Sequence, residues 1–168
     1  MKIEILIEDD RWNTVNLEAI AQRAGQGVTD HLGLERDIFS ADMLACDDAR
    51  ISVLNQEFRA KPTPTNVLSW PSGERGAEYV GEAPDKPDPI TDSELGDIAI
   101  SYETCLKEAH DAGITFADHL THLIIHAILH LFGYDHIEDE DAALMEGIEI
   151  AILETMGISN PYELNETE

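Results

Sequence analysis

Apolar and polar residues follow one another along this chain with two periods, one typical of strands and one typical of helices. Residues 2–8, KIEILIE, largely alternate between polar and apolar side chains and predict a strand. Further strands are predicted within residues 38–47 and at residues 65–70 and 96–101. Apolar residues at helical spacing predict helices at residues 14–32, 48–59, 102–112, 116–133 and 138–157.

Four strands with helices between and after them predict an α+β fold, with a small mixed four-stranded sheet packed against helices. At 168 residues, the whole chain is most simply a single domain with a hydrophobic core of its own. Between two of the predicted strands, residues 72–95 are rich in Gly, Pro and acidic side chains. We interpret this segment as a long acidic surface loop.

The composition adds limits on class and location. Apolar residues make up 43% and charged residues 27% of the chain, as in ordinary globular proteins. The first residues, MKIEILIEDDRW, reach acidic side chains too soon for a signal peptide, and no apolar run is long enough to span a bilayer. Cys46 and Cys105 are too few for a disulfide framework, so we expect buried free thiols. A cytoplasmic protein without a membrane partner is expected.

A formal net charge of −25 changes what the protein can be expected to bind. All ten Lys and Arg lie in residues 1–107, whereas residues 108–168 hold 14 Asp and Glu. A general nucleic-acid-binding protein presents a basic face, and this composition supplies none. If the substrate is a nucleic acid, binding must depend on a few local groups and a metal ion. The alternative interpretation of the acidity is solubility or adaptation to salt.

Three of the seven histidines occur within the eleven residues HAILHLFGYDH, residues 126–136. On a helix, His126 and His130 lie one turn apart and face the same side. Gly133 allows a left-handed turn at the end of the helix, which brings His136 back toward this pair. Two imidazoles from one helical turn and a third after a glycine turn predict a metal site with three nitrogen ligands.

Two comparisons refine this prediction. A set made of His119, His122 and His126 would span about 10 Å along one straight helix, which is too far for convergence on one ion. The spacing matches the H-E-x-x-H-x-x-G-x-x-H motif of metzincin peptidases, except that Ala127 replaces the Glu that takes a proton from water. Three neutral ligands leave the ion's charge intact and a fourth position open, which suits an anionic substrate such as a phosphodiester.

A phosphodiester also needs a cation beside the metal ion, preferably a planar guanidinium. Arg59 ends the predicted helix at 48–59, and Lys61 follows two residues later. The alternative for Arg59 is a solvated side chain that contacts the last helix carbonyls. In the neighbouring segment TNVLSWP, Asn66 and Ser69 offer hydrogen bonds to a substrate.

Two acidic residues have two interpretations each. Asp135, next to His136, either accepts a hydrogen bond from a ligand N–H or belongs to an exposed turn. Asp97 in the strand GDIAIS either orients a ligand or satisfies buried backbone groups.

The segments HAILHLFGYDH, TNVLSWP, LGDIAIS and LNQEFR together resemble the YbeY family of bacterial endoribonucleases. The resemblance extends from about Asp42 to the helix ending near Met156, and the histidine motif is its most specific part. It implies a zincin-like metallohydrolase fold. It also implies a single-strand-specific, metal-dependent endoribonuclease that acts in rRNA maturation, at the 3′ end of 16S rRNA, and in ribosome quality control.

The resemblance assigns roles to particular residues. His126, His130 and His136 would hold one Zn²⁺ per chain, and Arg59 would be a catalytic residue of the active-site cleft. Lys61, Asn66 and Ser69 would contact substrate. The implied partners are single-stranded RNA or rRNA precursors, small ribosomal subunit proteins and assembly factors.

The chain departs from the family pattern in two places. Asn66 stands where many members have Asp, and the 72–95 loop is longer and more acidic than expected. Two alternatives remain at this point. One is another zinc-dependent hydrolase, such as a peptidase with its base elsewhere. The other is a non-catalytic ribosome-assembly factor whose structural zinc has a fourth protein ligand.

Overall fold

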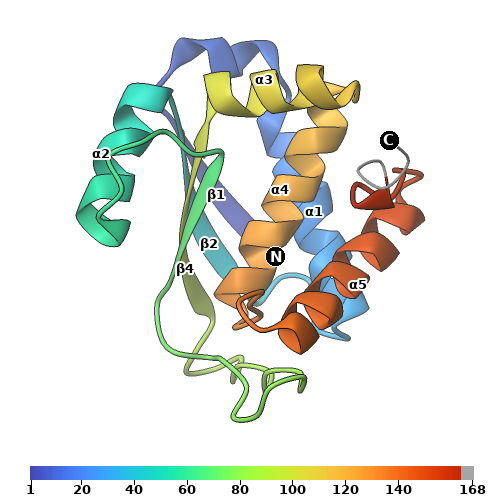
Figure 1. Cartoon of the computed structure of the whole chain (residues 1–168). Coiled ribbons are helices and arrows are strands. Elements are labelled where there is room, and N and C mark those ends of the chain that lie inside the picture. Colours follow the sequence, from blue (N-terminus) through green and yellow to red (C-terminus); the bar gives the residue numbers. More distant parts are fainter. Residues whose placement is uncertain (164–168) are drawn as a thin grey trace.

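The computed structural model describes residues 1–163 and contains one four-stranded mixed sheet (Figure 1). The strands are β1 (Lys2–Ile7), β2 (Ser40–Cys46), β3 (Val67–Pro71) and β4 (Glu94–Ser101), in the order β1-β2-β4-β3. The β1–β2 and β2–β4 pairs are parallel, and β3 runs antiparallel to β4 at the edge. The edge position explains how Pro71 fits in a strand, since proline lacks the N–H needed in a central strand. The α+β prediction with a mixed sheet is confirmed.

The helices follow the predicted ranges closely. They are α1 (Leu17–His31), α2 (Asp48–Arg59), α3 (Tyr102–Ala112), α4 (Phe116–Leu131) and α5 (Asp139–Thr155). The predicted helix at 14–32 is wrong at its start, because residues 10–14 form a separate 3₁₀ helix and the Asn16 side chain caps α1 by accepting from Ala19 N. Asp47 caps α2 by accepting from Arg50 N at 2.8 Å.

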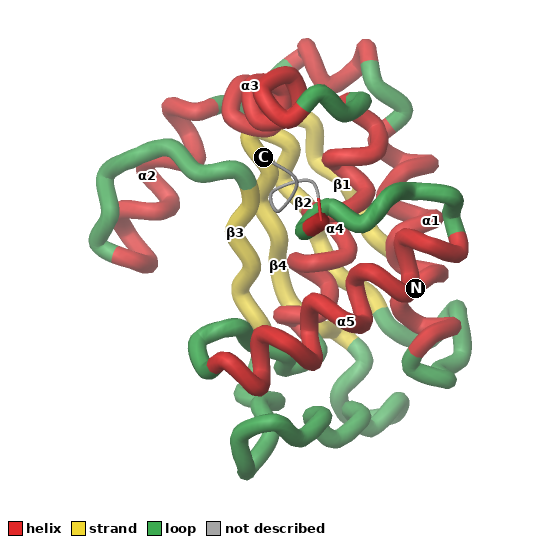
Figure 2. The backbone as a smooth tube through the Cα atoms, turned by 45° about the vertical axis from the view of Figure 1, so that its right-hand side comes forward, coloured by secondary structure: helices red, strands yellow, loops and turns green. Residues whose placement is uncertain are grey.

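The sheet lies between unequal helical layers (Figures 1 and 2). On one face, α1 and α4 pack against the sheet and form the main core with α5 outside them. On the other face, α2 covers a smaller cluster, Cys46, Ile51, Leu68 and Ala99. The histidine helix α4 is therefore a central element, buried on most of its surface, and this burial fixes the direction of its remaining polar stripe.

Gly27 explains how a helix with glycines in its middle can be part of this core. A Cβ there would lie 2.8 Å from side-chain atoms of both Ile152 and Met156. The glycine lets α1 and α5 approach closely, and this packing offsets the low helix propensity of glycine.

Residues 72–93 contain no helix or strand, and β4 begins at Glu94. This segment is more than a surface loop, because the Arg75 side chain within it is only 4% exposed. Its guanidinium donates to Asp92 at 2.6 and 2.8 Å, to Leu95 O at 3.0 Å and to Leu131 O at 2.9 Å. Arg75 thus ties the segment to the end of the histidine helix.

Within residues 1–163, no single helix has the length and apolar character needed to cross a membrane; α3 and α4 pass that test only as a pair, bent by 116°. Both cysteines are free and buried, as expected. Burial raises the pKa of the Cys46 thiol to about 12, so it is a structural group and not a nucleophile at neutral pH.

Candidate metal centre

The geometry of the site begins with the way α4 ends. Gly133 has φ of +103°, its N–H donates to His130 O, and Tyr134 N–H donates to Leu129 O at 3.0 Å. These two bonds form a Schellman motif, which reverses the chain direction just beyond the helix. A Cβ at residue 133 would lie 2.3 Å from Arg75 O, so a glycine is required both for the conformation and for the contact with the 72–93 segment. The turn returns His136 to the helix.

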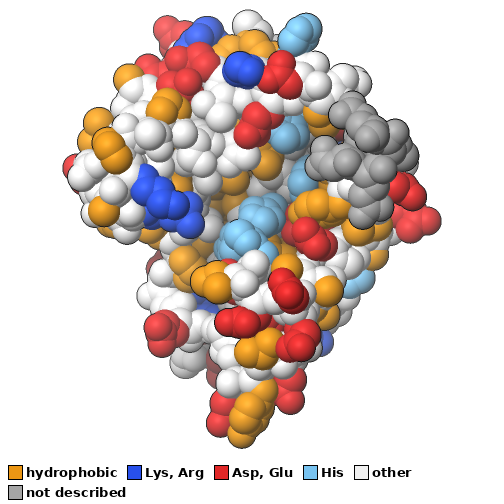
Figure 3. Space-filling view, viewed as in Figure 1, with side chains coloured by type: hydrophobic (Ala, Val, Ile, Leu, Met, Phe, Trp, Pro, Cys, Tyr) orange, Lys and Arg blue, Asp and Glu red, His pale blue; other side chains and the backbone are white. Residues whose placement is uncertain are grey.

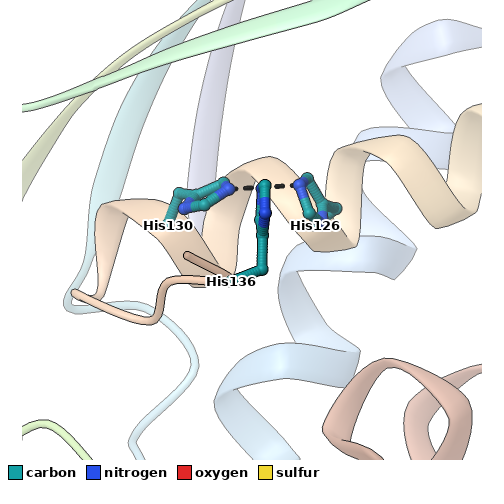
Figure 4. A group of neighbouring side chains, drawn as sticks. All are labelled: His126, His130 and His136. Carbon is teal, nitrogen blue, oxygen red and sulfur yellow. Dashed lines mark hydrogen bonds between the residues drawn. The ribbon is translucent and has the colours of Figure 1, made fainter. Parts of the chain in front are cut away.

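The three histidine rings converge beside α4, as Figure 4 shows. One ring nitrogen from each of His126, His130 and His136 lies within 4.8 Å of the others, and the Nε2 atoms of His126 and His130 are 3.1 Å apart. In a tetrahedral zinc site with Zn–N bonds of about 2.0–2.1 Å, ligand nitrogens are separated by roughly 3.3 Å. The His126 and His130 nitrogens are thus already about as close as in a zinc site, and the third nitrogen lies within 4.8 Å of both, so small ring movements would let the three bind one metal ion.

The hydrogen bonds on the far side of two rings determine which nitrogens can bind metal. His126 Nδ1 is 3.2 Å from Glu149 Oε2, and His130 Nδ1 is 2.9 Å from Tyr134 O. A carboxylate and a carbonyl only accept, so both Nδ1 atoms carry the proton. In the neutral rings both Nε2 atoms then present lone pairs to each other. Two lone pairs at this distance repel unless a cation lies between them, and so the donor set fits a metal ion.

Glu149 on α5 is the most deeply buried of the acidic groups around the site, with no exposed surface. It also accepts from His122 Nε2 at 2.7 Å and from the Tyr162 hydroxyl at 2.8 Å. Burial alone would raise the pKa of Glu149, but the hydrogen bonds from His122 and His126 outweigh it and lower the pKa to about 2. A charged carboxylate therefore orients the His126 ring.

Burial also affects His130, whose pKa it lowers to about 4 with help from the neighbouring charges of His126 and His136. The imidazole is therefore neutral at pH 7, which is the form that binds metal.

The other histidines of α4 do not join this cluster. His119 Nε2 contacts Glu108 Oε1 at 2.9 Å, while His122 contacts Glu149. Within the described part of the chain, the group suited to a metal ion consists of His126, His130 and His136 alone. The alternative ligand set that includes His119 and His122 therefore does not bring its nitrogens together around one point.

Asp135 and Asp97, for which the sequence left two interpretations each, are not hydrogen-bonded to the rings of the three histidines. Asp135 Oδ1 accepts from the backbone N–H of His136 at 2.7 Å, which stabilises the turn. Asp97 lies in β4 opposite Asp42, and burial followed by this like charge raises its pKa. The acceptors that do contact the rings, Glu149 and Tyr134 O, were not predicted. The sequence signal for Glu149 is a single acidic residue within the apolar run GIEIAIL.

The predicted substrate-binding residues lie around the end of α2 and along β3. Arg59 and Lys61 are exposed, and within residues 1–163 neither forms a salt bridge. Asn66 has partners of its own: its amide donates to Glu108 at 3.0 Å and its carbonyl oxygen accepts from Val67 N. Ser69 shares with Val67 the face of β3 that packs toward α4.

Charge and shape around the histidines are visible on the surface. In Figure 3 histidine side chains lie in a hollow, with Lys and Arg side chains on the side of α2 and Asp and Glu side chains toward α5. The negative charge of the protein is thus not uniform here, and one wall of the hollow is positive.

A central helix with two histidines one turn apart, a glycine turn and a third histidine, set on a small mixed sheet, defines a zincin-like α+β fold with a candidate metal site. The comparisons with known proteins narrow this class further. The chain belongs to the YbeY family: the family model described as Endoribonuclease YbeY matches residues 2–157. The match begins well before Asp42, so it covers more of the chain than the sequence segments alone suggested.

Individual relatives agree with the family match. The protein named Endoribonuclease YbeY from Paracoccus denitrificans is 54% identical over 165 residues, covering 98% of this chain and 92% of the relative. That from Dinoroseobacter shibae is 52% identical over 163 residues, covering 96% and 90%. The solution structure of TM1509 from Thermotoga maritima has a TM-score of 0.55 at 22% identity, covering 92% of this chain and 91% of that one, and it supports the fold.

Proposed function

We propose that this protein is a single-strand-specific metallo-endoribonuclease that acts in rRNA maturation, at the 3′ end of 16S rRNA, and in ribosome quality control. Membership in a family of endoribonucleases supports phosphodiester hydrolysis of RNA. The observation that carries the proposal is the convergence of three histidines beside a positive wall, two of which, His126 and His130, face each other with their Nε2 atoms.

The proposed cofactor is one Zn²⁺ per chain, held by His126, His130 and His136. When bound there, zinc supplies the Lewis-acid chemistry with which metalloenzymes polarise phosphate oxygens and activate water. Glu149 and Tyr134 O keep the Nδ1 protons on two of these rings and so keep their Nε2 atoms available. Three nitrogen ligands favour zinc over magnesium, which prefers oxygen.

The protein's own cations would position the RNA. Arg59 is the proposed catalytic residue, because a guanidinium can bind two phosphate oxygens and stabilise the charge that develops there. Lys61 would contact a neighbouring phosphate. Ser69 would donate to the substrate from β3, while Asn66 would do so only after exchanging a bond to Glu108. Ribosomal proteins of the small subunit and assembly factors are the proposed partners, in the cytoplasm.

Two alternatives meet specific obstacles. A peptidase of the metzincin type needs a carboxylate after the first histidine, and Ala127 is instead buried in the core. A structural zinc site has four protein ligands, whereas the cluster found within residues 1–163 has three.

The function is tested by measuring zinc content and RNA cleavage together. We expect the His126→Ala, His130→Ala and His136→Ala variants to lose zinc and cleavage of a single-stranded rRNA fragment, while His119→Ala keeps its zinc. His119 is the better control, because His122 shares Glu149 with His126. Zinc retained in all three variants, or zinc-loaded wild type that cleaves peptides but not RNA, would overturn the proposal.

A further inference from the structure

An aromatic pair lies at the C-terminal end of α2, close in the chain to Arg59 and Lys61. Phe58 is 61% exposed although its side chain is entirely apolar. Its ring centroid is 5.1 Å from that of Trp70 on β3, with the ring planes at 64°. Trp70 is half-buried against the cluster under α2 and so holds the Phe58 ring in place. The pair presents an apolar surface to solvent that the fold itself does not cover.

Most of the positively charged side chains are paired with carboxylates. Six of the ten Lys and Arg form salt bridges with carboxylates: Lys2, Arg11, Arg36, Arg50, Arg75 and Lys107. Among the described residues, the four without such a bridge are Arg23, Arg59, Lys61 and Lys86. Two of these four, Arg59 and Lys61, follow directly after Phe58 at the end of α2. In an acidic protein, unneutralised cations beside an exposed aromatic ring are suited to a partner that is both anionic and aromatic.

The pair lies within reach of the histidine cluster. The chain leaves β3 at Pro71 and reaches Arg75, whose carbonyl contacts Gly133 in the turn between His130 and His136. Trp70 and Arg75 are five positions apart in the chain, so their Cα atoms can be separated by at most about 18 Å even in a fully extended chain. β3 itself packs against α4, and in Figure 3 the hollow that holds the histidines adjoins the basic side chains near α2. A single RNA strand can therefore span both places.

We propose that Phe58, supported by Trp70, is a stacking platform for one unpaired base of the RNA, with Arg59 and Lys61 binding the phosphates beside that base. This inference rests on the proposed function and supplies a physical reason for single-strand specificity. A stacked base must present its face to the ring, and a base in a duplex already uses both faces. Stacking tolerates any base, since every base has a π-face.

The test measures binding rather than cleavage, so that its result does not depend on catalysis. The probe is a fluorescent single-stranded 2′-O-methyl RNA of about 12 nucleotides, within the usual site size for single strands. It is compared with versions in which an abasic residue replaces each nucleotide in turn. Fluorescence anisotropy with the zinc-loaded protein gives the Kd for wild type, Phe58→Leu, Phe58→Tyr and Val53→Ala.

Phe58→Leu keeps an apolar side chain but lacks the ring, so we expect binding to weaken about 5- to 100-fold. Phe58→Tyr keeps the ring and restores binding. Val53 is a 48%-exposed apolar residue of the same helix, and Val53→Ala serves as the control with unchanged binding. At one position the abasic residue should weaken binding to wild type by a similar factor and have no further effect on Phe58→Leu.

Equal binding by wild type and Phe58→Leu, or abasic penalties that persist unchanged in Phe58→Leu, would overturn the platform. Failure of the proposed function has a different signature, namely no cleavage of natural RNA by zinc-loaded wild type. The two outcomes are therefore distinguishable.

Discussion

Arg59 and Glu149 carry opposite charges and lie in opposite environments, one exposed at the end of α2 and the other fully buried on α5. Because their positions and environments differ, the two residues can have different roles. Arg59 can reach a phosphate because no carboxylate among the described residues neutralises it. Glu149 is inaccessible to substrate and acts only through the histidines that it contacts.

We expect Arg59→Ala to reduce kcat/KM for a single-stranded RNA by an amount equivalent to about 2–4 kcal/mol, because a charge-assisted contact in the transition state is lost. Arg59→Lys should recover only part of this, since it restores charge without the bidentate geometry. Zinc content and thermal stability should match wild type. Equal rates for all three proteins would reduce Arg59 to a surface residue.

Glu149→Gln should weaken zinc binding about 10- to 100-fold, because an amide can donate as well as accept and no longer fixes the proton on His126 Nδ1. Competition with a chelator measures the affinity, and ring ¹⁵N NMR reports the His126 tautomer. Glu154→Gln, an exposed position on the same helix, is the matched control. Tyr162→Phe leaves the carboxylate in contact with His126 and should have a smaller effect. Unchanged affinity and tautomer in Glu149→Gln would contradict an orienting role.

At the scale of elements, the glycine turn after α4 determines whether the third histidine reaches the other two. The turn was predicted from Gly133 alone, and the structure confirms it with both bonds of a Schellman motif. The contact of this turn with Arg75 was not predictable, because the 72–93 segment has no periodicity that would place it. Only the packed structure shows that Arg75 donates to Leu131 O.

Gly133→Ala should destabilise the fold and lower zinc occupancy together. A positive φ costs a non-glycine residue roughly 1–3 kcal/mol, and the added Cβ would meet the Arg75 carbonyl at 2.3 Å. Thermal unfolding and zinc content measure the two effects. Gly147→Ala in α5 is the control, since a Cβ there meets nothing within 4 Å and alanine favours a helix by about 1 kcal/mol. A Gly133→Ala protein as stable as wild type would contradict this prediction, because the 72–93 segment would then have moved away from the added Cβ at little cost in free energy.

At the scale of the whole molecule, a net charge of −25 repels RNA while one wall of the hollow attracts it. Ordinary RNA-binding proteins bind through many phosphate contacts and lose affinity steeply as salt increases. Here few cations are free to contact phosphate, and the surrounding carboxylates act over distances that salt screens. The two effects oppose each other.

We therefore expect kcat/KM on single-stranded RNA to stay level or rise as monovalent salt increases from roughly 10 to 100 mM, where the Debye length shortens from about 30 to 10 Å. Initial rates at fixed zinc occupancy measure this. In Arg59→Ala the rise should be steeper, because the salt-sensitive attraction is reduced. A tenfold fall in wild type over the same range would show that local attraction outweighs the repulsion.

The sequence by itself determined the features that depend on neighbours along the chain. Helix periodicity and the eleven residues from His126 to His136 place two histidines one helical turn apart and form the turn after them, through bonds between residues a few positions apart. Only the tertiary structure decided which residues from distant parts of the chain contact these elements. Glu149 meets His126 across 23 residues, Arg75 meets Leu131 across 56, and Phe58 meets Trp70 only because α2 packs beside the edge strand. These contacts arise from the packing of whole elements, whose faces and offsets no local period specifies.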